Sequence, residues 1–222
     1  MNLNQSRIRL FESENSIPRF SRIPLARSVR WWSHFEKANE ITPAVSVFVT
    51  QKAYIRTVAY AGADLSNEVG GWLIGKTRRD RTTGEQFVVI ETVLPARHIR
   101  HGSAYLTFTH ASQVSVLGIM DNYFPDKQLI GWFHTHPGMG VFFSQMDSWL
   151  HQNYFKEIWQ IGLVIEPRSS KGGFFIWQSN GDLDSQKYFG FYELLNKKRR
   201  SIVNWVNMDD KVEETLERSC KN

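Results

Sequence analysis

Short blocks of hydrophobic positions recur along the chain, and their spacing predicts a mixture of strands and helices. In residues 45–49 three valines alternate with Ser46 and Phe48, a pattern typical of a buried strand. Residues 51–61 carry apolar side chains at intervals that favour a helix. Further strands are expected at 72–74, 87–90, 129–133, 161–165 and 173–178, and further helices at 111–122 and 147–157.

These blocks follow one another in an order that predicts the fold class. Between two expected strands, residues 77–85 are charged and turn-like, and Gly84 favours a hairpin there. Strands and helices interspersed in this way predict an α/β (α+β) fold, with a central mixed β-sheet flanked by helices. We expect this main domain to span residues 43–185.

The two ends of the chain differ from this middle part. Residues 1–42 are rich in Arg and Ser and lack sustained periodicity, so we interpret them as an N-terminal extension. Its aromatic residues Trp31, Trp32 and Phe35 fit either an arm that packs onto the main domain or a segment that docks a partner. Residues 186–222 are charged, and we expect a C-terminal helical segment there.

Composition narrows the class of protein. The 222 residues are 41% hydrophobic, which is enough to bury one substantial core. The net charge of +5 is mild, so we expect no nucleic-acid partner. No apolar run approaches the ~20 residues of a membrane span, and the first residues lack the apolar core of a secretory signal. A single cysteine, Cys220, excludes an internal disulfide and fits a reducing compartment, so we expect a cytoplasmic protein.

The most informative chemistry lies in the sequence Gly-Trp-Phe-His-Thr-His-Pro at residues 131–137. His134 and His136 are one residue apart, so an extended backbone turns both imidazoles to the same side. The glycine-rich turn that follows can bring Asp147 back to the same ion. Two histidines and one carboxylate leave a fourth tetrahedral position open, which is the pattern of a catalytic zinc site. A water at that position has its pKa lowered toward ~7.

Two further residues complete the pattern, although each has a simpler interpretation. Ser144 stands three residues before Asp147, a spacing that by itself indicates a helix N-cap followed by an acid in the first turn. Glu68 precedes a glycine-rich predicted strand, where an acidic residue alone is typical of a solvated surface. The conjunction of all five residues favours a zinc hydrolase site.

This set of residues resembles the motif of the JAMM (MPN-plus, JAB1/Mov34/PAD-1) zinc metalloproteases, in which a Glu is followed by His-x-His-Pro and then Ser-x-x-Asp. The stretches 68–75 and 131–138 are similar to the two halves of that motif, and Glu166-Pro167 is similar to a later segment. The resemblance covers about residues 45–185. It implies a JAB1/MPN-type fold, similar to the cytidine deaminase sandwich, and one Zn²⁺ per chain.

The resemblance also implies a reaction and a role for each residue. Enzymes of this family cut after the C-terminal glycine of ubiquitin or a ubiquitin-like protein, by deconjugation or precursor processing. His134, His136 and Asp147 would bind zinc. Glu68 would act as general base and then as proton donor to the leaving amine, and Ser144 would hydrogen-bond the oxyanion.

Two insertions of the family map to loops of this chain. The first, near residues 96–108, pairs in relatives with the extended tail of the substrate, although a merely solvated loop is the simpler interpretation. The second maps to residues 168–173. Because several relatives need a partner protein to organise these insertions, this chain could also require an activating partner.

Three other functions are alternatives to this one. A peptidase that trims the C-terminus of a small sulfur-carrier protein would use the same chemistry on a different substrate. A non-catalytic MPN scaffold is disfavoured because the ligand set is complete. A zinc-dependent deaminase is disfavoured because its zinc site uses a pair of cysteines, and Cys220 stands alone.

Overall fold

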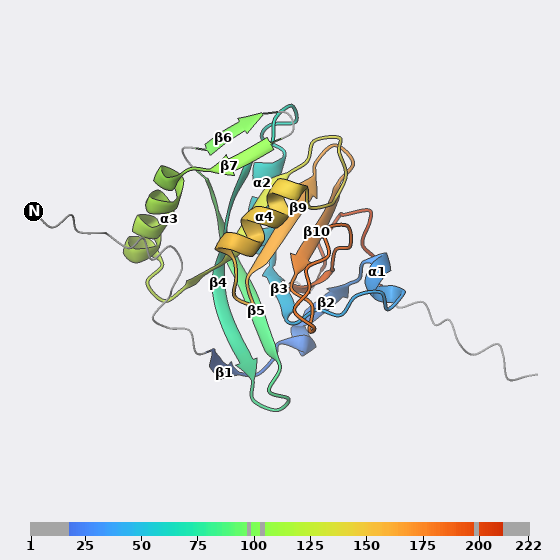
Figure 1. Ribbon diagram of the computed structural model, residues 1–222. Coiled ribbons are helices and arrows are strands. Elements are labelled where there is room, and N and C mark those ends of the chain that lie inside the picture. The colour runs from blue at the N-terminus through green and yellow to red at the C-terminus, as the bar shows by residue number, and fades with distance from the viewer. Residues whose placement is uncertain (1–17, 97–98, 103–104, 198–199, 211–222) are drawn as a thin grey trace, which may run out of the picture.

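A computed structural model describes residues 18–96, 99–102, 105–197 and 200–210, and its main feature is one large mixed sheet (Figure 1). The strands are β1 (Arg19–Ser21), β2 (Ser28–Trp31), β3 (Ser46–Thr50), β4 (Gly70–Asp80), β5 (Gln86–Pro95), β6 (Ile99–Gly102), β7 (Tyr105–Phe108), β8 (Gln128–Thr135), β9 (Ile161–Glu166), β10 (Lys171–Ile176) and β11 (Phe191–Leu194). The helices are η1 (Leu25–Arg27), α1 (His34–Lys37), α2 (Gln51–Ala61), α3 (His110–Tyr123) and α4 (Gln145–Tyr154).

The sheet has the order β10-β9-β8-β4-β5-β3-β11-β2, and β1 pairs separately with β4. The pairs β8–β9, β3–β5 and β11–β3 are parallel, whereas β4–β5 and β4–β8 are antiparallel. In Figure 1, α4 lies in front of the sheet, α3 lies at its side, and the β6–β7 hairpin stands at the opposite end from β1. The predicted fold class, a mixed sheet with flanking helices, is confirmed.

Most predicted elements are present, and their ends follow local capping. Helix α2 spans the predicted residues 51–61, and the Thr50 side chain accepts a hydrogen bond from the backbone N–H of Ala53 to cap it. The prediction was wrong for residues 77–80, which continue β4, and residues 77–79 pair with β5. The tight turn is therefore shorter than expected, and Gly84 adopts a φ of 76° within it. Within the described residues, no helix combines the length and apolar character needed to cross a membrane.

The described segments before and after the predicted main domain add strands to this sheet. In the N-terminal extension, β2 pairs with β11, while Trp31 and Phe35 pack against the core as an arm would. The expectation of a helical C-terminal segment was wrong for residues 191–194, because β11 pairs between β3 and β2. The described residues beyond Ser185 contain no helix. Residues 211–222, with Cys220, lie outside the described part.

Large aromatic side chains fill the core between the sheet and its helices. Trp72 on β4 and Trp132 on β8 are directly paired and almost fully buried. Strands β8 and β9 approach closely at Gly131, where an added Cβ would lie 1.8 Å from the carbonyl oxygen of Ile161. This packing fixes the end of β8, where the two predicted metal ligands stand.

Candidate metal centre

The sheet register brings Glu68 next to the two histidines. Gly70 at the start of β4 pairs with His134 near the end of β8. One residue further along, the backbone N–H of Thr135 donates to the carbonyl of Val69 at 2.9 Å. The N–H of Val69 in turn donates to Thr135 Oγ1 at 2.9 Å. Two hydrogen bonds therefore fasten the segment that carries Glu68 to the strand that carries the histidines.

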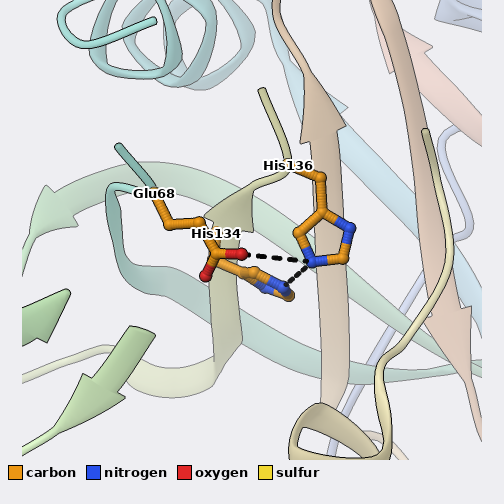
Figure 2. A group of neighbouring side chains, drawn as sticks. All are labelled: Glu68, His134 and His136. Carbon is orange, nitrogen blue, oxygen red and sulfur yellow. Dashed lines mark hydrogen bonds and ion pairs between the residues drawn. The ribbon is translucent and has the colours of Figure 1, made fainter. Parts of the chain in front are cut away.

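The two imidazoles face each other at the end of β8 (Figure 2). Their Nε2 atoms lie 2.9 Å apart, and Oε1 of Glu68 lies 3.8 Å from Nε2 of His136. The ligand atoms of Glu68, His134 and His136 all fall within 4.8 Å of one another. The ring of Trp132 stacks on His134 with centroids 4.8 Å apart, so the first imidazole cannot rotate freely.

Asp147 reaches the same pair of nitrogens from α4. Its Oδ1 lies 3.3 Å from Nε2 of His134, and its Oδ2 lies 3.7 Å from Nε2 of His136. Ser144 is the N-cap of α4: its hydroxyl accepts from the N–H of Asp147, and its own N–H donates to Oδ2 of Asp147. The structure therefore brings all five predicted residues together, and Ser144 has the capping role that its spacing indicates.

The site is buried, and the different partners of its two carboxylates move their pKa values apart. Glu68 is 3% exposed, and removal from water raises its pKa to about 7 against the lowering effect of His136. Burial also acts to raise the pKa of Asp147. There, however, the charge of His134 and hydrogen bonds from His134, His136 and Ser144 outweigh burial and hold the pKa well below its usual range. The carboxyl group of Glu68 therefore titrates near neutral pH, whereas that of Asp147 stays ionised.

These residues fit a zinc ion. Imidazole nitrogens and a carboxylate oxygen are the donors that zinc prefers, at ~2.0–2.2 Å. Two donors of one tetrahedral zinc then stand about 3.3 Å apart. The observed separations of 2.9 Å between the two Nε2 atoms and 3.3 Å from His134 to Asp147 are close to that value. Glu68, at 3.8 Å, lies slightly further out.

A buried carboxylate, Glu166, holds the loop after His136 in place. The residue pattern did not predict this role. Glu166, at the end of β9, accepts hydrogen bonds from the N–H groups of Gly138, Arg168 and Ser169. Burial acts against ionisation, but the Ser169 hydroxyl and these N–H groups together lower the pKa of Glu166. Gly138 has a φ of 77°, which a glycine adopts without strain. The resemblance marked Glu166, yet nothing in the local sequence indicates which loop it binds.

A second buried network supports the sheet beneath the site. The indole N–H of Trp132 donates to Nδ1 of His151 at 3.1 Å, and His151 is fully buried on α4. His151 is not among the residues predicted from the sequence. Its position four residues after Asp147, on the same face of a helix, is the signal that would have found it.

The two predicted insertions have different outcomes. Residues 99–102 and 105–108 pair as the antiparallel strands β6 and β7, separate from the main sheet, so the described part of this segment is not a plain loop. Arg97 and His98 lie outside the described residues. At the second position, only a short turn joins β9 to β10, and residues 171–173 belong to β10. In that turn, the Arg168 guanidinium donates to the carbonyl of Leu65, on the segment before Glu68.

Comparisons with known proteins agree with this architecture. A family model described as prokaryotic homologs of the JAB domain matches residues 50–186. A 26S proteasome non-ATPase regulatory subunit 14 from Dictyostelium discoideum is 22% identical over 143 residues, which are 62% of this chain and 45% of that protein. The NAD(+) hydrolase TcpA of Theionarchaea archaeon (strain DG-70-1) is 34% identical over 80 residues, 35% of this chain and 24% of that protein. The chain thus spans less than half the length of these relatives.

The solution structure of protein DSY2949 from Desulfitobacterium hafniense covers 70% of this chain and 99% of its own, with a TM-score of 0.49 and 21% identity. The family match carries the assignment, because it covers more than half of the chain and includes His134, His136, Ser144 and Asp147. The chain belongs to the prokaryotic JAB family of the JAMM/MPN group.

Proposed function

We propose that this protein is a zinc-dependent peptidase or isopeptidase that cuts after the C-terminal glycine of ubiquitin or a ubiquitin-like protein. The observation that carries the proposal is the convergence of two imidazoles and two carboxylates in one buried site, at the same end of the sheet as the β6–β7 hairpin. The family supports the class of chemistry, and the residues of the site support the individual roles.

His134, His136 and Asp147 are the proposed zinc ligands. Asp147 is the better third ligand than Glu68, because its oxygens lie nearer to the two Nε2 atoms and it stays ionised. The backbone N–H of Ser144 holds one of its oxygens at 2.8 Å, as a supporting hydrogen bond to a ligand does. Bound zinc would supply Lewis acidity at the scissile carbonyl.

Glu68 is the proposed general base and acid. Its carboxylate faces His136 from the start of β4, and a pKa of about 7 lets it accept a proton from the attacking water near neutral pH. The same carboxyl group then passes the proton to the leaving amine. The hydrogen bonds between Val69 and Thr135 fix the segment that carries Glu68, so the proton acceptor is held beside the histidines.

Ser144 is proposed to stabilise the developing oxyanion. Its oxygen accepts from the N–H of Asp147, and its side chain also hydrogen-bonds the Asp147 carboxylate, so the hydroxyl hydrogen would turn from Asp147 toward the oxyanion in the reaction. The cap and the catalytic role are therefore compatible in one side chain. The N-terminal end of α4 adds a favourable dipole for negative charge at this point.

The β6–β7 hairpin is the proposed guide for the substrate tail. An extended tail has unpaired backbone donors and acceptors, and a free-standing hairpin offers an edge to which a strand can be added. The printed name of the relative in the 26S proteasome gives no substrate, so the ubiquitin-related substrate rests on the family resemblance. NAD hydrolysis is not carried over, because the match spans only 24% of TcpA.

Cleavage of a fusion between a ubiquitin-like protein and a reporter tests this function. The wild type should cut after the terminal glycine, and a chelator should stop the reaction until zinc is restored. Glu68→Gln should lose ~10²–10⁴-fold in kcat while it still binds zinc, because only proton transfer is removed. Glu157→Gln, an exposed acid, is the matched control and should keep full activity.

Two further substrates separate the alternatives. A sulfur-carrier protein with residues added after its Gly-Gly tail should be trimmed more slowly than the ubiquitin-like fusion. The reverse order would favour the sulfur-carrier function. Equal cleavage of unrelated unfolded peptides would contradict a deconjugating enzyme, and zinc binding without any cleavage would favour a scaffold.

A further inference from the structure

A second concave site lies on β4, at the end away from the metal centre. Two strands pair in turn with the same edge of β4: β8 pairs as far as Gly75, and β1 begins opposite Arg78. Residues 76 and 77 fall in the gap between them. There the Gln128 side chain accepts hydrogen bonds from the N–H and hydroxyl of Thr77, which takes the place of a strand partner.

This gap holds a pocket with strongly unequal charge. Its volume is about 160 Å³, many times the ~10–15 Å³ that one water needs. The pocket is lined by Arg19, Lys76, Thr77, Arg78, Pro125, Asp126, Lys127 and Gln128. Four of these side chains are cationic and one is anionic. The pKa of Asp126 is lowered by its hydrogen bond from Lys76 and by the charges of both lysines, which agrees with a positive local potential.

The two lysines have acidic partners, and the two arginines are the exception. Lys76 pairs with Asp126 at 2.8 Å, and Lys127 pairs with Glu91, which does not line the pocket. Among the described residues, no ion pair is formed by Arg19 or Arg78. Within the described part of the chain, Arg78 donates only to the carbonyl of the preceding residue, Thr77.

The nearest acid on the strand does not neutralise these arginines. Asp80 accepts from the N–H groups of Ile23, Thr82 and Thr83, so its carboxylate is committed to the turn. Arg19 and Arg78 are direct partners in the parallel pairing of β1 and β4. Like charges at paired positions destabilise a sheet. A multivalent anion between them would reverse that repulsion.

We propose that this pocket, formed by Arg19, Lys76, Arg78 and Lys127, binds a phosphate-bearing anion. One guanidinium group can donate two parallel hydrogen bonds to a phosphate. The pocket presents two guanidinium groups that have no other counter-ion among the described side chains. The site is distinct from the metal centre. Arg78 stands eight residues along β4 from Gly70, the partner of His134, which corresponds to about 26 Å of strand. The inference therefore does not rest on the proposed peptidase activity.

Isothermal titration calorimetry with inorganic phosphate, pyrophosphate and ADP tests the site. Wild type should bind at least one of them saturably, and the comparison shows whether a free or a nucleotide-borne phosphate is preferred. Arg78→Gln and Arg19→Gln should each weaken binding by tenfold or more without lowering the melting temperature. Arg79→Gln is the matched control, since this exposed neighbour on β4 does not line the pocket. Its affinity should stay within about twofold of wild type.

Further measurements make the proposal falsifiable. His136→Ala should retain the affinity, and a loss there would place the anion at the metal centre instead. Equal weakening in Arg79→Gln and Arg78→Gln would reduce the effect to overall charge and overturn a defined pocket. Binding of a glutamate-rich peptide or of duplex DNA, with none of the three phosphates bound, would also overturn it.

Discussion

The backbone N–H of Ser144 donates to Oδ2 of Asp147 at 2.8 Å, while Oδ1 of the same carboxylate lies 3.3 Å from His134. One aspartate therefore closes the first turn of α4 and faces the histidines. The reciprocal bond, from the N–H of Asp147 to the Ser144 hydroxyl, completes a capping box. Helix capping and positioning of the proposed metal ligand share the same atoms here, so a single substitution at Ser144 is expected to affect both.

Ser144→Ala should affect both stability and catalysis. Loss of an N-cap hydroxyl costs ~0.5–2 kcal/mol of unfolding free energy. If the hydroxyl also donates to the oxyanion, kcat should fall by ~10²–10³ with little change in zinc content. Urea denaturation, metal analysis and kinetics on one ubiquitin-like fusion measure the three effects together.

Thr50→Ala is the matched cap variant for this experiment. Thr50 caps α2 through the N–H of Ala53, away from the metal centre. It should lose stability by a similar amount and keep a normal kcat. If Ser144→Ala behaves in the same way as Thr50→Ala, then Ser144 is a cap and not an oxyanion donor.

The core of the candidate site could be predicted because its spacing is local. His134 and His136 follow one strand, and Ser144 and Asp147 begin the next helix, so a short stretch of chain determines their approach. Helix α2 could be predicted for the same reason, since its periodicity and its cap lie within a dozen residues. Only Glu68 reaches the site through pairing with a distant strand, and its place there was predicted from the family resemblance alone.

The parts that escaped prediction depend on distant partners. Strand β11 has four residues within a charged segment, and it is held by pairing with β3 and β2. Glu193 on this strand is fully buried and accepts hydrogen bonds from the Trp31 indole, the Gln51 side chain and the N–H of Ile202. These donors come from three separate segments. The residues next to Glu193 in the sequence therefore do not indicate its burial, and from the sequence alone it resembles a surface residue.

His136→Ala should abolish zinc binding. Wild type should contain about one zinc per chain by metal analysis, and the variant should contain little, because an imidazole ligand is lost from a site with three protein ligands. Added zinc should also raise the melting temperature of the wild type only, since a ligand that binds the native state stabilises it. His34→Ala, at an exposed histidine, should match wild type in both measurements. Equal zinc in wild type and His136→Ala would contradict the ligand assignment.

Stability should fall in acid because of His151. Burial lowers its pKa from the ordinary 6.5 to about 3, so the folded protein holds this ring neutral while the unfolded chain protonates it. Between pH 6.5 and about 3 the unfolded state binds the extra proton. The unfolding free energy should therefore decrease as pH falls through this window, by up to ~1.4 kcal/mol per pH unit from this residue. Above pH 6.5 the contribution should be flat.

Replacement of the imidazole isolates this contribution. His151→Gln keeps an acceptor for the Trp132 indole but does not titrate, so its unfolding free energy should vary less between pH 7 and pH 4.5 than that of wild type. Urea denaturation of both proteins after chelation removes differences in zinc content. His34→Gln, at the surface, should follow the wild-type slope. Identical slopes for wild type and His151→Gln would show that the buried ring does not control the acid sensitivity.

The β6–β7 hairpin should matter for tail recognition and not for the metal. Replacing residues 99–107 by a Gly-Ser segment of equal length removes the strand edge but leaves Phe108, which is buried in the core. Two or three lost backbone hydrogen bonds at ~0.5–1.5 kcal/mol each predict a drop in kcat/KM on the order of 10–1000-fold for a full ubiquitin-like tail. Zinc content should be unchanged, and a Gly-Gly peptide too short to reach the hairpin should be cut as by wild type. Unaltered cleavage of the full tail would mean that the substrate strand is added elsewhere.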